Sequence, residues 1–95
     1  MDPEKVLSVG ERGIHILFET PIIAAAFGQD PENLRRALAA RPSRIQKVVQ
    51  EVLALPTVAE ARRYIAELPR PYQYVLVLLY FELLDGRLRR NPTLH

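Results

Sequence analysis

The sequence predicts a mainly α-helical domain in which about four helices form a small orthogonal or bundle-like array around one buried helix. The first reason is the segment 71–85, PYQYVLVLLYFELLD, where Glu82 is the only charged side chain between residues 74 and 84. Its apolar residues point in every direction on a helical wheel, so a helix here has to be covered on every side. The second reason is that prolines and capping residues divide the rest of the chain into segments of helical length.

The buried central helix is expected to cover residues 71–85. Pro69 and Pro71 are tolerated at or before a first helical turn, and Gly86 stands where a left-handed residue would end the helix. Leu79, in the middle of the segment, is predicted to be a core side chain. Residues from about 87 onward are expected to form a loosely held tail, because they offer little to bury.

Glu82 is the one acidic residue that this pattern could place in the buried core. A buried Glu82 would need a cationic partner, for which Arg62, Arg63 and Arg70 are the candidates. We favour the other interpretation, in which Glu82 marks a solvent-facing edge of the central helix.

Residues 2–20 fit two structures, and the sequence does not choose between them. Asp2, Pro3 and Glu4 supply an N-cap, a first-turn proline and a first-turn acid, which predicts a short helix ending at Gly10. The alternative is a short N-terminal β-hairpin. Its turn would be residues 10–13, and its second strand the alternating pattern of residues 14–20.

Four further segments follow before the central helix. A short apolar segment, residues 22–27, begins after the cap residues Thr20 and Pro21 and stops at Gly28. Helices are expected over residues 31 to about 40, about 43 to 54, and about 57 to 68, where residues 57–60 (TVAE) form a capping box. The helix at 43–54 has the clearest one-sided pattern; its predicted inward face consists of Ile45, Val48, Val49, Val52 and Leu53.

Length and composition indicate one globular domain, residues 1–95, with 48% hydrophobic and 25% charged residues. The absence of cysteine excludes disulfides and thiolate metal sites. The N-terminal residues do not resemble a secretory signal, and the apolar segment is shorter than a membrane span, so we expect a cytoplasmic protein without membrane contact. Eleven of the thirteen basic residues are arginine, which is typical of a GC-rich bacterial genome.

No residue pattern predicts catalysis. His15 and His95 are the only histidines, and His15 has no second ligand at the spacing of a metal site. Ser43 and Thr57 are explained as helix-start residues rather than nucleophiles, and the four glycines match no phosphate-binding loop. We therefore expect no catalytic residues, no cofactor and no metal.

The basic residues raise the alternative of a nucleic-acid-binding surface. The candidates are Arg35, Arg36, Arg41, Arg44, Lys47, Arg62 and Arg63. Adjacent residues on a helix diverge by about 100°, and acids at positions 32, 51, 60 and 67 dilute the field. The sequence does not show whether these side chains converge on one face.

One segment is similar to a known family. Leu68-Pro69, followed by VLVL at 75–78 and YFE at 80–82, resembles the opening helix of region 4 in bacterial RNA polymerase sigma factors. In that family the helix packs behind a helix-turn-helix that reads promoter DNA. The resemblance ends at residue 82 and does not extend to a turn and recognition helix, so it implies a transcription-associated role without assigning DNA-reading residues.

The sequence favours a non-catalytic helical protein–protein interaction module that pairs as a homodimer or with another, unidentified protein. Its apolar residues exceed what so few helices can cover, and each large side chain left in water forgoes about 1.5–3 kcal/mol. Ile22, Ile23 and Phe27 are the candidate interface. A two-fold dimer is the commonest way for a small protein to hide such a surface.

Overall fold

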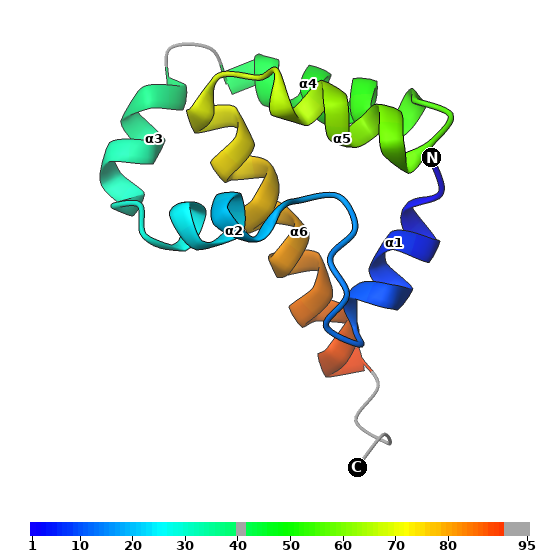
Figure 1. Ribbon diagram of the computed structural model, residues 1–95. Helices are drawn as coiled ribbons and strands as arrows, with labels where there is room; N and C mark the ends of the chain where they lie inside the picture. Colours follow the sequence, from blue (N-terminus) through cyan, green and yellow to red (C-terminus); the bar gives the residue numbers. More distant parts are fainter. Residues whose placement is uncertain (40–41, 91–95) are drawn as a thin grey trace.

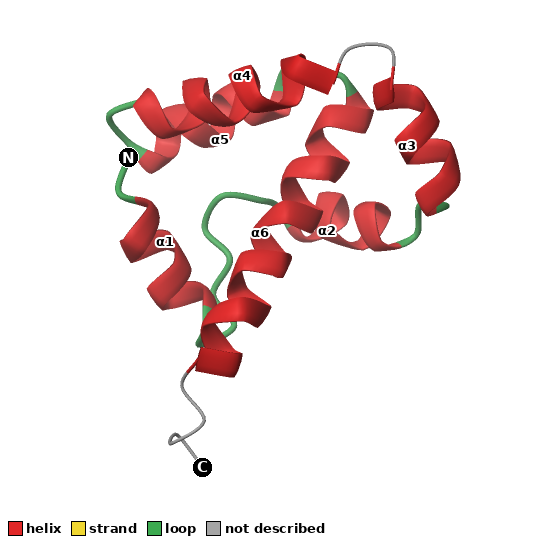
Figure 2. Ribbon diagram, turned by 180° about the vertical axis from the view of Figure 1, so that it is seen from behind, coloured by secondary structure: helices red, strands yellow, loops and turns green. Residues whose placement is uncertain are grey.

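The computed structural model describes residues 1–39 and 42–90, and every regular element in this part of the chain is a helix. The mainly α-helical prediction is confirmed, with six helices rather than about four (Figures 1 and 2). They are α1 (Pro3–Gly10), α2 (Thr20–Phe27), α3 (Pro31–Ala39), α4 (Pro42–Ala54), α5 (Val58–Ala66) and α6 (Arg70–Arg90).

The long helix α6 is the spine to which the other elements attach (Figure 1). Helix α2 packs across it with the most extensive contact in the molecule, and α3 and α1 also contact it. Helices α4 and α5 lie side by side at one end of α6, where α5 turns into it. Helix α3 lies near the start of α6, and helix α1 lies near its other end (Figure 2).

The core lies where α6 meets α5, α4, α1, α2 and the segment between α1 and α2. Ala61 of α5 and Val77 of α6 are completely buried. The other buried apolar side chains are Val6, Leu17, Phe18, Ala26, Leu34, Val48, Val52, Ile65, Leu76, Tyr80 and Leu84. The prediction that residues 71–85 form the centre of the core is therefore correct for one side of α6.

The helical interpretation of the N-terminus is correct, and no strand of the alternative hairpin occurs in the described residues. The Asp2 side chain caps α1 by accepting from the Glu4 backbone N–H at 3.0 Å, and the helix ends at Gly10 as expected. The chain then turns at Gly13, whose φ is 85°. Leu17 and Phe18 are both buried although they are neighbours, whereas a strand would place them on opposite faces.

Helix α6 is longer than predicted. It continues through Gly86 to Arg90 instead of ending at Asp85, so residues 87–90 belong to it and not to a tail. The rest of the predicted tail, 91–95, lies outside the described residues. The extension has a tertiary cause, because Arg87 donates at 2.8 Å both to Glu4 of α1 and to Glu11 just beyond it.

The remaining helix starts follow local signals with one exception. Thr57 caps α5 by accepting from the Glu60 N–H at 3.2 Å, as the capping box predicts. Asp30 accepts from the Glu32 N–H at 3.1 Å at the start of α3. Thr20 is the exception, because it is the first residue of α2 and the capping position belongs to Glu19, whose side chain makes no cap hydrogen bond.

Candidate functional site

An open apolar groove of about 510 Å³ lies between α1, α4 and α6, and we call it the α1/α4/α6 groove. Three exposed leucines lie along it: Leu53 of α4 (44% exposed), Leu79 (37%) and Leu83 (59%) of α6. The other lining residues are Met1, Pro3, Val6, Leu7, Leu17, Phe18, Val49, Val52, Ile65, Leu76, Tyr80 and Glu82. Its walls are therefore almost entirely hydrocarbon.

The groove exists because α1 bridges two elements instead of lying flat on α6. At its C-terminal end Gly10 is in close contact with Tyr80 and Leu84 of α6. At its start the Met1 ammonium group donates to the Leu55 carbonyl, at the end of α4. Helix α1 thus forms the third side of a triangle with α4 and α6, which both views show (Figures 1 and 2).

This groove corrects two predictions. Leu79 is not a core side chain, because it is 37% exposed and none of the helices described lies over its side of α6. Leu53 belongs to the predicted inward face of α4 but is exposed at the groove. The sequence does show that α6 has apolar residues on all of its sides. This pattern does not show which of those sides is left without a neighbouring helix.

Glu82 is exposed, as the favoured interpretation expected, and among the described residues it is the only charged side chain in the lining of the groove. None of the ion pairs among the described residues involves it. The groove therefore combines a hydrocarbon surface with one carboxylate that makes no ion pair and with the Met1 ammonium group, which donates to the Leu55 carbonyl.

A second apolar surface lies on the other side of α6, and we call it the aromatic face. It consists of His15, Phe27 and Phe81, with Leu88 further along α6; the exposed Ile14 precedes His15 in the chain. The Phe81 ring contacts His15 (centroid distance 4.8 Å) and Phe27 (5.2 Å), and Phe27 is 58% exposed. Ile14 and Leu88 are about half exposed, and Leu88 lies two turns along α6 from Phe81, on the same side.

The structure separates the predicted interface residues. Ile22 and Ile23 are partly buried and pack against the core, because α2 lies across α6. Phe27, at the end of α2, is the only one of the three that is mostly exposed. It belongs to the aromatic face.

The predicted basic residues do not form one continuous surface within the described part of the chain. Arg35 pairs with Glu32 on α3, and the Arg44 guanidinium lies 5.5 Å from the centre of the Tyr72 ring. Arg36 and Lys47 are exposed, and Arg41 lies outside the described residues.

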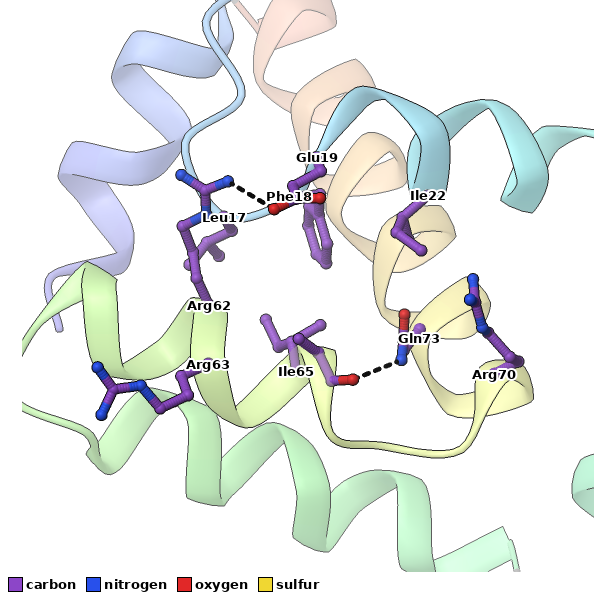
Figure 3. A pocket seen from close by; sticks show the side chains of 10 residues that line it. Leu17, Phe18, Glu19, Ile22, Arg62, Arg63, Ile65, Arg70 and Gln73 are labelled. Atoms are coloured by element: carbon purple, nitrogen blue, oxygen red, sulfur yellow. Dashed lines mark hydrogen bonds and ion pairs between the residues drawn. The ribbon is translucent and has the colours of Figure 1, made fainter.

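Arg62, Arg63 and Arg70 line a second cavity, of about 370 Å³, between α5, the start of α6 and residues 17–22 (Figure 3). Arg62 pairs with Glu19 at 3.6 Å, and Arg63 points away from the cavity (Figure 3). The three guanidinium groups therefore do not converge on one point.

The buried polar groups serve the fold. Gln73 donates to the carbonyls of Ala66 (3.2 Å) and Leu68 (2.8 Å), which fixes the turn between α5 and α6. His15 Nδ1 lies 2.7 Å from the Tyr80 hydroxyl, and burial raises the pKa of Tyr80 above its usual value. Hydrogen bonding to Glu51 raises the pKa of Tyr64.

The described residues contain no cluster of carboxylates and histidines that could hold a metal ion. None of the helices described combines the length and the apolar content that crossing a membrane requires. Searches of protein-family models, curated proteins and solved structures found no match to this chain.

Proposed function

We propose that this protein is a non-catalytic helical interaction module that pairs with a second copy of itself through the aromatic face. The observation that carries the proposal is Phe27, a large aromatic side chain that is 58% exposed and held against Phe81. Such a ring is costly to leave in water, and aromatic side chains are enriched where proteins meet.

The surroundings of Phe27 favour a protein partner. The exposed Leu88 extends the apolar surface along α6 from Phe81, and the Phe81 ring contacts the rings of His15 and Tyr80. Rigid aromatic side chains lose little conformational entropy on binding. A two-fold dimer would bury the same set from both copies, which doubles the apolar area removed from water.

Sedimentation equilibrium of the wild type and two matched variants tests the proposal. The wild type is expected to approach twice 10.9 kDa as its concentration rises through the micromolar range. Phe27→Gln should shift the association to concentrations at least about tenfold higher, because one central aromatic residue commonly dominates an interface. Leu83→Gln, at an equally exposed apolar site in the groove, should associate like the wild type.

Two outcomes would contradict this assignment. A single 10.9 kDa species that does not change on concentrating would rule out self-association. Dissociation by Leu83→Gln but not by Phe27→Gln would place the dimer interface at the groove.

Nucleic-acid binding is the alternative, and the observation that favours it is that Arg62, which also pairs with Glu19, and Arg70 both line the second cavity. A titration with mixed nucleic acids at low and moderate salt distinguishes the two functions. Micromolar binding that weakens steeply with salt and is lost in Arg70→Gln supports the alternative. No binding at low salt excludes it.

A further inference from the structure

We propose that the α1/α4/α6 groove is a docking site for an amphipathic helix of another protein, one that carries a basic residue beside its apolar stripe. This surface is separate from the aromatic face: Leu79 and Leu83 lie on roughly the opposite side of α6 from Phe81 and Leu88. The inference therefore does not depend on self-association.

The shape of the groove argues against a second copy as its occupant. The groove is a hollow bordered by α1, α4 and α6, and its lining includes Leu17 and Phe18 of the segment between α1 and α2. If a two-fold axis brought two such grooves face to face, two hollows would meet and leave a void between them. If a ridge elsewhere on a second copy entered the groove, the contact would be head-to-tail and would build rings or open chains instead of a two-fold dimer. The occupant is therefore a convex element of a different protein.

The arrangement of the apolar side chains fits a helix. Leu79 and Leu83 are one turn apart on α6, and Leu53 lies across the groove from them. An amphipathic helix presents its own apolar side chains with the same spacing, and it can lay that stripe along a groove of this kind. A small-molecule pocket, by contrast, has several polar groups that converge to orient the ligand. Glu82 is the only charged side chain here, and the groove is open along its length.

The charge of the groove defines the chemistry of the partner. When a helix covers the leucines, it also removes water from around Glu82, and a carboxylate that loses water without gaining a cation is destabilised. Lysine or arginine on the flank of the docking helix would supply that cation. An acid at the same place would add repulsion. The groove should therefore select helices with a basic flank over otherwise identical helices with an acidic one.

A display selection tests this with the full chain and a defined probe. The library is a set of helical peptides with leucine fixed at positions i, i+4 and i+7 and with all flanking positions randomised. Selection on the wild type should enrich lysine or arginine next to the leucine stripe. One enriched peptide is then synthesised, labelled and titrated by fluorescence anisotropy, together with its twin in which the basic residue is replaced by glutamate.

Four variants locate the binding site. Leu83→Gln should lower the affinity for the basic peptide by at least about tenfold. Glu82→Lys should lower the affinity for the basic peptide by on the order of tenfold. The same variant should bind the glutamate twin more tightly than the wild type does. The matched controls lie outside the groove and outside the aromatic face: Leu38→Gln replaces a half-buried leucine of α3, and Glu67→Lys reverses another exposed acid. Both controls should bind within about twofold of the wild type. Circular dichroism melts of all four confirm that they are folded.

Several results would overturn the proposal. One is a selection that enriches no helix, and another is enrichment with no preference for a basic flank. Unchanged binding in both Leu83→Gln and Glu82→Lys would place the peptide elsewhere. If dodecanoate bound in the groove and no helix did, the groove would belong to a small apolar ligand. In each case the sedimentation result for Phe27→Gln stands on its own.

Discussion

Tyr80 of α6 contacts side chains of the segment between α1 and α2. Its ring contacts Phe18 (centroid distance 5.4 Å) and His15 (5.5 Å), and its hydroxyl is hydrogen-bonded to His15 Nδ1. Helix α1 approaches this ring at Gly10, where a Cβ would overlap the Tyr80 hydroxyl and press on Leu84. Gly10 therefore does more than end a helix, since it also allows α1 and α6 to meet.

Two glycine substitutions test this close approach. Gly10→Ala is expected to lower the free energy of unfolding by about 1–3 kcal/mol, because the added methyl group overpacks the contact with Tyr80. Gly86→Ala is expected to raise it by about 0.5–1 kcal/mol, because Gly86 lies inside α6 with open space around it. Urea denaturation of both variants measures the difference. A neutral Gly10→Ala would mean that the two helices can separate freely at this point.

The buried hydroxyl of Tyr80 should also make the fold sensitive to alkali. Burial raises the pKa of Tyr80 in the folded state above its model value of 10.0. Its contribution to stability is therefore complete below about pH 10 and is lost as the pH rises through the higher folded value. Tyr80→Phe keeps the ring and should flatten the fall in melting temperature from about pH 9 to pH 11.

Tyr64 has a raised pKa for a different reason, its hydrogen bond to Glu51, and so Tyr64→Phe is the comparison. If neither substitution reduced the alkaline loss, the loss would come from groups other than these two tyrosines.

Among the elements, α6 shows how an apolar helix can be buried on one side only. Leu76, Val77, Tyr80 and Leu84 are buried, while Leu79 and Leu83 are exposed one turn apart. The buried side faces the core formed with α5, α2 and the segment before α2. The exposed side faces the groove that α1 and α4 border but do not fill.

A pair of leucine substitutions on α6 measures this division. Leu76→Ala should cost about 2–5 kcal/mol, because it removes a buried side chain and leaves a cavity. Leu79→Ala should cost about 1 kcal/mol or less, because a side chain that is 37% exposed has already lost part of its contacts. The denaturant midpoints of the two variants measure these costs. Equal costs would show that the groove is closed in solution.

At the scale of the whole molecule, the helices differ in how firmly they are attached. Helices α5 and α6 supply Ala61, Ile65 and Val77, which are among the most buried residues. Helix α3 contributes one buried side chain, Leu34, and its Arg35–Glu32 pair is exposed. The molecule therefore has a firm centre and a weakly held helix at one side.

Amide hydrogen exchange should reveal this difference. Amides near Val77 in α6 and Ala61 in α5 are expected to exchange most slowly, at a rate set by global unfolding. Amides of α3 should exchange at least about tenfold faster through local opening, because little apolar surface holds this helix in place. Protection of α3 equal to that of α6 would show one cooperative unit instead.

Local sequence signals account for the starts of α1 and α5. Asp2 caps α1 and Thr57 caps α5 as predicted, because a cap and the N–H groups that it binds lie within three residues of one another. The sequence also named Ile22, Ile23 and Phe27 as apolar residues that need cover; Phe27 is exposed, whereas Ile22 and Ile23 pack against the core. Self-association remains a prediction that the sedimentation experiment tests.

Only the tertiary structure decided where α6 ends and which of its sides stays uncovered. The signal of Gly86 was overridden by Arg87, whose partners Glu4 and Glu11 lie 83 and 76 residues away in the chain. Leu53 and Leu79 look like core residues on a helical wheel, but they line an open groove because α1 is anchored at both ends and bridges over the space. A wheel shows which sides of a helix are apolar, whereas the positions of neighbouring helices decide which of those sides are buried.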